Sequence, residues 1–341
     1  MKKYIKFISF ISFYIFGTIF VFAENHNKYK YIKTWENESF GRISPITFSS
    51  TNKYYVAYAS SKIGFLSVGN IRTGKQKCLS ALKMSTGEYV LHPNKDVMLL
   101  EFNTKNFSEE EIIFKEIDLS SCKVIKKYKI KVTGGNKGQL FYFNNNPMYV
   151  YYNLNYNLNY DDQVLYLINI KKNKRKILPI KDIFSIYYNQ NIKSPILAFK
   201  SSDNIIYFDV KTEKLLWVHN YEDADSVSIS KDGIYSAYSS NENNEINIFN
   251  IKTGKKIKKI KGHSYLYGFN GINGDLLVYH NNIINIYSKK SNWNKKKITI
   301  NLPNFPKNRY GIPAVTSFSF NKNYLLLGNE DAMVSLFRLL K

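Results

Sequence analysis

The chain has 341 residues, a formal net charge of +23 and 16% aromatic residues. Only five of its 49 basic residues are arginines, whereas nucleic-acid-binding surfaces favour Arg because it makes bidentate and stacking contacts. The charge therefore does not predict binding to nucleic acid. The sequence lacks the spaced ligands of a metal site, a phosphate-binding loop, a dinucleotide fingerprint and a Gly-x-Ser-x-Gly elbow, so we expect no enzyme activity and no cofactor.

The N-terminus has the pattern of a secretory signal peptide over residues 1–23. Three lysines precede an apolar run, Phe7–Ala23, which ends in small or branched residues. We expect cleavage before Glu24, which leaves 24–341 as one exported domain, periplasmic or extracellular, with no transmembrane span. The alternative is an uncleaved anchor, and a run of this length is at the short limit for crossing a bilayer.

After this segment, short stretches of alternating apolar and polar residues are separated by turn clusters. The clearest example, Asp225–His263, reads as four strands with Gly233 and Gly254 in its turns, and Gly tolerates the positive backbone angles of tight turns. Comparable stretches recur, so we expect an all-β repeat protein. In chain order the stretches are 44–83, 87–131, 139–180, 185–219, 226–261, 265–302 and 314–341.

The third strands of these stretches end in residues that align at intervals of 38 to 51 residues. The aligned residues are Asn70, Asp118, Asn169, Asp209, Asn250, Ser288 and Arg338. This recurrence, together with GNEDAMVSLFRL near the C-terminus, resembles the repeats of WD-repeat β-propellers, although no complete Trp-Asp pair is present. The resemblance implies a seven-bladed β-propeller of four-stranded antiparallel blades. Residues 29–36 alternate like an outer strand but precede the first stretch, and 314–341 supplies only three strands, so we expect the N-terminal strand to join the C-terminal blade and close the ring.

One stretch, 185–219, contains IIYFDVKTEKLLWVHN, which resembles the repeat of quinoprotein-type propellers. Glu213 stands where that repeat usually has Gly, and no other stretch has Trp at the position of Trp217. We therefore interpret Trp217 as an apolar side chain that fills the space between blades, and we infer no quinone cofactor from it.

The histidines and cysteines are interpreted as structural. His92 lies in a Leu-His-Pro-Asn turn and is predicted to be a turn residue, and His263 follows Gly as in WD repeats. Cys78 and Cys122 fall at or near the outer strands of neighbouring blades. Outer strands diverge from the axis of a propeller, and a disulfide needs Cα atoms within about 7 Å. We expect two free or buried thiols, with one disulfide as the alternative.

Two loops are the candidate partner-binding segments. The first contains NLNY twice over 153–160, and the second is the Pro-rich segment 303–313. Tyr and Arg side chains are enriched at binding hot spots. The predicted partner-binding residues are Tyr156, Tyr160, Arg309 and Tyr310.

These observations favour an exported, monomeric, non-catalytic scaffold that binds a protein partner in the cell envelope or outside the cell through its loop face. One alternative is a quinoprotein-like propeller that acts in envelope assembly or in redox chemistry. Another is a propeller hydrolase, because the paired carboxylates of such enzymes meet only in space.

Overall fold

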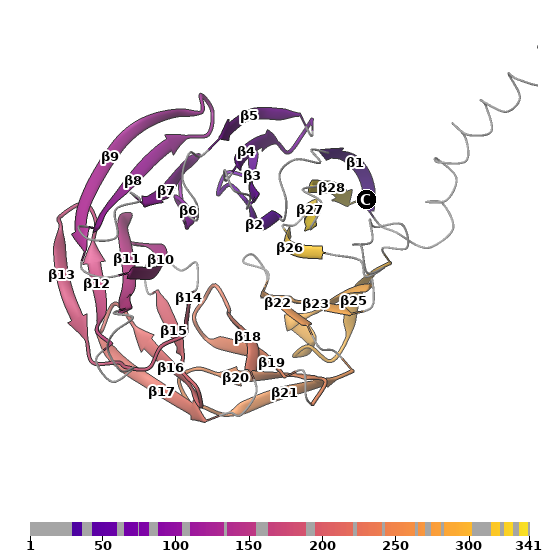
Figure 1. Cartoon of the computed structure of the whole chain (residues 1–341). Coiled ribbons are helices and arrows are strands. Elements are labelled where there is room, and N and C mark those ends of the chain that lie inside the picture. The colour runs from indigo at the N-terminus through magenta and orange to yellow at the C-terminus, as the bar shows by residue number, and fades with distance from the viewer. Residues whose placement is uncertain are drawn as a thin grey trace, which may run out of the picture.

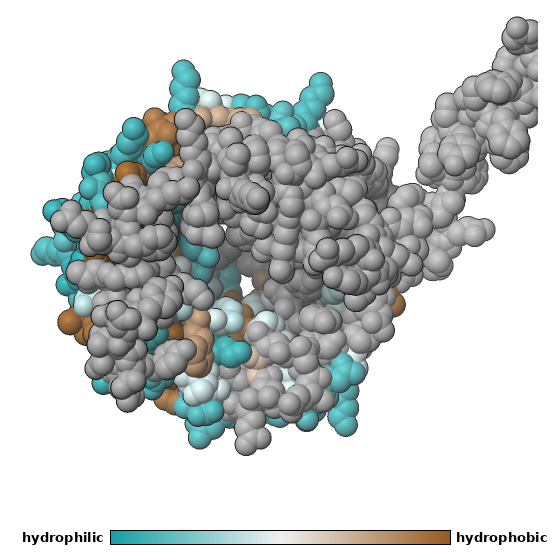
Figure 2. Space-filling model, in the orientation of Figure 1, coloured by the Kyte–Doolittle hydropathy of each residue, from teal (hydrophilic) through white to brown (hydrophobic). Residues whose placement is uncertain are grey.

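The protein is an all-β propeller in which antiparallel sheets surround a central axis, as seen in a computed structural model (Figure 1). The inner strand of each sheet lies near the centre of the ring, where Figure 2 shows an opening, and the outer strands form the rim. The structure describes residues 29–35, 43–59, 65–73, 75–81, 88–103, 110–132, 135–154, 163–188, 195–220, 224–240, 243–262, 265–269, 274–280, 283–301, 315–320, 324–329 and 334–339.

Six blades are each formed by four consecutive antiparallel strands. The first three blades contain β2 (Ile43–Phe48), β3 (Tyr54–Ala59), β4 (Phe65–Asn70) and β5 (Gln76–Ala81); β6 (Tyr89–Leu91), β7 (Val97–Asn103), β8 (Glu110–Asp118) and β9 (Lys123–Val132); and β10 (Gly135–Phe143), β11 (Asn146–Leu154), β12 (Leu165–Asn169) and β13 (Lys174–Leu178). The next three contain β14 (Ser185–Tyr188), β15 (Ile196–Lys200), β16 (Asn204–Asp209) and β17 (Lys214–Asn220); β18 (Ala224–Ile229), β19 (Tyr235–Ser240), β20 (Glu245–Asn250) and β21 (Lys256–Lys261); and β22 (Tyr265–Phe269), β23 (Leu276–His280), β24 (Ile283–Tyr287) and β25 (Lys296–Asn301). A 3-10 helix, η2 (Lys289–Ser291), lies between β24 and β25.

The remaining sheet is a composite of the two ends of the chain. It contains β26 (Val315–Phe320), β27 (Tyr324–Asn329) and β28 (Val334–Leu339), and β1 (Tyr29–Trp35) pairs antiparallel with β28. The predicted count of seven blades is therefore corrected to six blades of four consecutive strands and one composite sheet. The repeat pattern identifies only the third strand of each stretch, and β28 is the third strand of the C-terminal stretch. In the described chain no fourth strand follows β28, so its outer neighbour is β1, from the N-terminal end of the described residues.

Five of the seven aligned residues at the ends of third strands share a structural role. At Asn70 and Asn250, the side-chain Oδ1 accepts the backbone N–H groups of the residues two and three positions later, at 2.8 to 3.1 Å. The side chains of Asp118, Asn169 and Asp209 make the same kind of contact. Short Asx side chains close turns in this way. The repeated Asn and Asp residues therefore reflect closure of the turn between the third and fourth strands.

The hydrophobic core lies between neighbouring blades. One cluster joins Phe141 and Val150 of the third blade to Leu197 and Phe199 of the fourth. The other described clusters join neighbouring blades in the same way. Because each blade buries its apolar faces only against its neighbours, burial stabilises the ring as a unit rather than each blade alone.

Trp217 on β17 fills the boundary between its blade and the next, as predicted. Its ring stacks on Tyr207 and also contacts Phe249 of the next blade, each at 5.7 Å between ring centroids. Gly254, in the turn between β20 and β21, lies against the same indole, and a Cβ atom at this position would be 2.5 Å from it. The close approach and a φ of 66° both require glycine here.

The substitution Gly254→Ala is expected to lower the free energy of unfolding by roughly 2–4 kcal/mol, because a left-handed backbone and an overpacked contact each cost about 1–3 kcal/mol. Gly262→Ala is the matched control: its φ is 77°, but no atom lies within 4 Å of the added Cβ. The control should cost about 1–2 kcal/mol. Urea unfolding measures both values, and equal losses would refute the role of the Trp217 contact.

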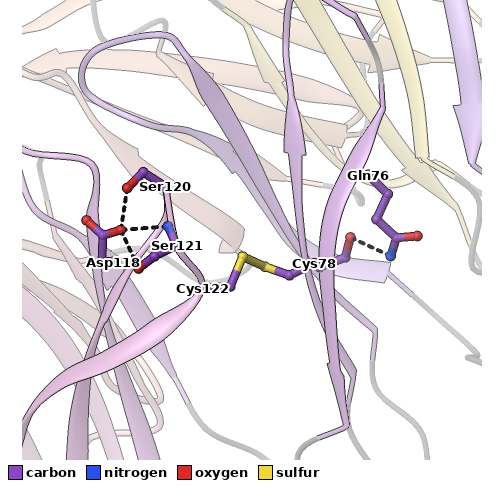
Figure 3. Close-up of a disulfide and its surroundings, with 7 residues drawn as sticks. Gln76, Cys78, Asp118, Ser120, Ser121 and Cys122 are labelled. Atoms are coloured by element: carbon purple, nitrogen blue, oxygen red, sulfur yellow. Dashed lines mark hydrogen bonds between the residues drawn. A yellow bond between two sulfur atoms is a disulfide. The ribbon is translucent and has the colours of Figure 1, made fainter.

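Cys78 and Cys122 form a disulfide, with their Cα atoms 6.3 Å apart (Figure 3). The prediction of two free or buried thiols is therefore wrong. Cys78 lies on the outer strand β5, but Cys122 lies in the turn between β8 and β9 with a φ of 59°. The prediction assumed two diverging outer strands, whereas a turn at the end of one blade reaches the outer strand of its neighbour. The disulfide links two adjacent blades.

Asp118 closes the turn that presents Cys122. Its Oδ1 accepts hydrogen bonds from the Ser120 hydroxyl at 2.5 Å, the Ser121 hydroxyl at 2.8 Å and the Ser121 backbone N–H at 2.7 Å (Figure 3). These hydrogen bonds, led by the one from Ser120, lower the pKa of the Asp118 carboxyl below its usual value. The charged carboxylate thus holds the turn in the shape that places Cys122 against β5.

Within the described residues, no helix is long and apolar enough to cross a membrane. The predicted signal peptide, residues 1–23, lies outside them.

Candidate functional site

The predicted partner-binding residues lie outside the described part of the chain. They are Tyr156, Tyr160, Arg309 and Tyr310. The tandem NLNY segment is described only at its start, where Asn153 on β11 pairs with Asn136 on β10. His263 also lies outside the described residues. The loops that were predicted to bind a partner are therefore not placed, and the described strands and turns supply the candidate site.

His92 is a turn residue, as predicted. It follows β6, is 8% exposed, and its Nδ1 accepts the backbone N–H of Asn94 at 3.1 Å. Its ring lies 4.9 Å from the ring of Tyr142 on the next blade. Burial, and secondarily the charge of Lys95, lower the pKa of His92. Across the described ranges, no group of three or more His, Cys, Asp or Glu side chains could hold a metal ion.

Polar side chains lie on neighbouring inner strands, near the centre of the ring. Glu88 immediately precedes β6, and its side chain is hydrogen-bonded to that of Gln139 on β10. On β18, the half-buried Ser226 hydroxyl lies 2.8 Å from the hydroxyl of Ser239. The Glu88–Gln139 hydrogen bond joins two neighbouring blades, whereas the Ser226–Ser239 contact lies within one blade, between β18 and β19.

A second carboxylate lies deeper in the same region. Glu101 on β7 is 5% exposed, and its Oε1 accepts a hydrogen bond from the Tyr149 hydroxyl of the next blade at 3.3 Å. Its backbone N–H donates to the Glu88 carbonyl at 2.9 Å. Burial, with a further contribution from Glu101, raises the pKa of Tyr149 well above its usual value. Tyr149 therefore stays protonated and acts as a hydrogen-bond donor between two blades.

Glu88→Gln is expected to raise the Tm at pH 7 by a small amount. The Glu88 side chain is accessible to solvent but surrounded by protein atoms, and this desolvation raises its pKa above the usual 4.5. Because the pKa of this carboxyl is higher in the folded protein than in the unfolded chain, the protonated side chain favours folding. This contribution is fully present below the pKa of the unfolded chain and is lost as pH rises through the pKa of the folded protein. The gain from Gln should therefore disappear near pH 4. Thermal unfolding from pH 4 to pH 8 measures it, and a pH-independent gain would contradict the assignment.

A belt of cations covers the outer strands of four consecutive blades, β9, β13, β17 and β21. These strands contain no acidic residue. We call their Lys and Arg side chains the basic rim, and hydrophilic residues are visible around the edge of the ring in Figure 2. The basic rim consists of Lys123, Lys126, Lys127, Lys129, Lys131, Lys174, Arg175, Lys176, Lys214, Lys256, Lys258, Lys259 and Lys261.

Exposed aliphatic side chains lie among the cations of the basic rim. Ile177 on β13 is 60% exposed and Ile125 on β9 is 55% exposed. The full set on the four outer strands is Val124, Ile125, Ile177, Leu215, Val218 and Ile257. Each of the four outer strands carries one or two of these exposed aliphatic side chains. The rim therefore combines long-range charge with short-range apolar contact area.

Positive charge on the basic rim is in excess among the described residues. The ion pairs described there are Lys129–Glu111, Lys176–Glu213 and Lys259–Glu245. Lys127 stands directly opposite Lys115 in the pairing of β8 with β9. Burial, with a further contribution from Lys127, lowers the pKa of Lys115. An anionic group bound at the rim would relieve this repulsion.

Recognition is predicted in loops, and none of the predicted partner-binding residues lies on the outer strands of the basic rim. The available signal is KVIKKYKIKV over 123–132 and KIKKIK over 256–261, where lysines occupy neighbouring positions in a strand. Successive side chains of a strand point to opposite faces, so consecutive lysines indicate that both faces reach solvent. Strands of this kind lie at the edge of a sheet. The pattern therefore predicts an exposed basic edge.

No family model matches the chain, and no curated protein matches it either. The likeness to WD-repeat and quinoprotein repeats therefore remains a resemblance in sequence pattern, while the propeller arrangement itself is shown by the structure.

Proposed function

We propose that this protein is an exported, non-catalytic interaction scaffold whose basic rim binds a protein partner with an acidic surface. The observation that carries the proposal is the basic rim, in which four consecutive outer strands have no acidic residue and expose aliphatic side chains among their cations. Lysines attract an acidic partner over a distance and raise the association rate, while aliphatic contacts add affinity at short range.

The packing of the ring supports this role. Because the cores lie between blades, neighbouring outer strands keep fixed relative positions, and binding to them orders little additional backbone. The disulfide between Cys78 and Cys122 supports the proposed export, because disulfides persist in oxidising compartments. The predicted signal peptide at residues 1–23 leads to the same expectation.

Crosslinking in the native cells, followed by capture of the protein and mass spectrometry, tests the proposal. The rim variant carries Lys174→Glu, Lys214→Glu and Lys261→Glu, which are exposed positions on three outer strands. The matched control carries the same charge change at exposed turn positions away from the rim, with Lys53→Glu, Lys75→Glu and Lys95→Glu. A discrete acidic protein should be captured by the wild type and by the control, and lost from the rim variant.

A further variant that lacks residues 153–160 separates the rim from the loop face. Loss of the partner from this variant alone would place binding on the loop face and contradict the rim. Retention of the partner by the rim variant would contradict the proposal in the same way. Circular dichroism of each variant verifies that it is folded.

A further inference from the structure

The strand β9 differs from the other outer strands of the basic rim in its length. It has ten residues, Lys123–Val132, whereas β13, β17 and β21 have five, seven and six. It is the terminal strand of its sheet and pairs on one side with β8. Every second residue of such an edge strand directs its backbone N–H and C=O away from the partner strand. Among the described strands of the rim, β9 is therefore the longest template for a further strand.

The edge of β9 accepts a hydrogen bond from outside its own sheet. The Arg175 Nη2 on the next blade donates to the backbone carbonyl of Lys131 at 2.5 Å. This contact shows that a main-chain acceptor near the end of β9 points toward a group beyond the sheet. A partner backbone along the preceding residues could use the remaining edge groups in the same way.

The side chains of β9 define the chemistry of a complementary strand. Five lysines are distributed along it, and Val124 and Ile125 are 44% and 55% exposed. Lys115 on β8, which stands opposite Lys127, adds a further positive charge next to β9. A strand that carries carboxylates and small apolar side chains would match both features, because opposite charges and aliphatic pairs on neighbouring strands are stabilising.

We propose that β9 docks an extended acidic segment of a protein partner by β-strand addition. This inference rests on the proposed function and names the kind of partner that the rim takes. The lysines oppose pairing of β9 with the equivalent edge of a second copy, because like charges would meet. A flat anionic membrane would touch only a short arc of the convex rim and would leave the backbone edge of β9 without partners (Figure 1).

Fluorescence anisotropy with the full-length protein and synthetic decapeptides tests the inference. The probe is a labelled, end-blocked peptide of alternating Glu and Val. One comparison peptide has the same sequence with N-methyl groups on alternate residues, which removes backbone donors without changing charge. A second alternates Lys and Val. The Glu–Val peptide should bind, N-methylation should weaken binding by at least about tenfold, and the Lys–Val peptide should not bind.

Variants locate the binding edge. Lys123→Glu with Lys127→Glu, both exposed on β9, should weaken binding of the Glu–Val peptide by on the order of tenfold or more at low salt. Lys171→Glu with Lys172→Glu, in the exposed turn between β12 and β13, makes the same charge change and should leave binding unchanged. Amide hydrogen exchange should slow within β9 when the peptide is bound.

Several outcomes would overturn the inference. Equal binding of the N-methylated peptide would show that charge alone holds it, and equal losses in both double variants would show that β9 is not the site. Binding to phosphatidylglycerol vesicles without binding of the Glu–Val peptide would assign the rim to membranes. If none of the peptides binds but native crosslinking still depends on Lys174, Lys214 and Lys261, strand addition fails while the proposed function stands.

Discussion

Removing the disulfide by Cys78→Ser or Cys122→Ser is expected to lower the free energy of unfolding by about 4 kcal/mol. The bridge joins positions 44 residues apart, and a loop of that size restricts the unfolded chain by about this amount in the loop-entropy model. It also ties the outer strand of one blade to a turn of the next. Guanidinium unfolding with and without reductant measures the effect.

The control for this prediction is the double variant Cys78→Ser with Cys122→Ser. It should match each single variant, and reductant should have no effect on it. Reductant should lower the unfolding midpoint of the wild type to that of the double variant. An unchanged wild-type midpoint under fully reducing conditions would show that the bridge contributes nothing to stability.

Deleting residues 24–36, which include β1, is expected to destabilise the entire ring. β1 pairs with β28 over six residue pairs. At about 1 kcal/mol for each of about six backbone hydrogen bonds, the loss is roughly 6 kcal/mol. The deletion also leaves β28 as an exposed edge that favours aggregation. Urea unfolding and size-exclusion chromatography should show a lower midpoint and larger species.

Deletion of residues 24–28 alone is the matched control, because it leaves β1 intact. This shorter deletion should unfold with the wild-type midpoint. If both deletions behave like the wild type, β1 does not contribute to closure of the ring, and the composite sheet must be stable with three strands.

The alternation of apolar and polar residues was sufficient to predict most strands and the propeller class. The blade around Asp225–His263 is an example, because its Gly turns and strand lengths are local features and depend only on nearby backbone geometry. The aligned Asn and Asp residues were correctly located, but their role was not predicted. Their side chains close a turn, and this became evident only from the hydrogen bonds of Asn70 and its counterparts.

Three features depended on contacts between distant parts of the chain and were not predicted correctly or at all. The predicted count of seven blades was wrong, because the C-terminal repeat supplies only three strands, although the N-terminal strand that completes its sheet was predicted correctly. Cys122 meets Cys78 because a turn reaches across a blade boundary. The basic rim emerges only when four outer strands, spread over 123–261, are brought to one edge of the ring.

The sequence by itself determined where the strands and turns lie, because pleat alternation and turn geometry are properties of a few neighbouring residues. It also determined that the chain carries a large excess of lysine over arginine and over acidic residues. Only the tertiary structure decided that Cys122 approaches Cys78 and which lysines stand together. These depend on how blades rotate about a common axis, and that rotation is set by apolar packing between residues far apart in the chain.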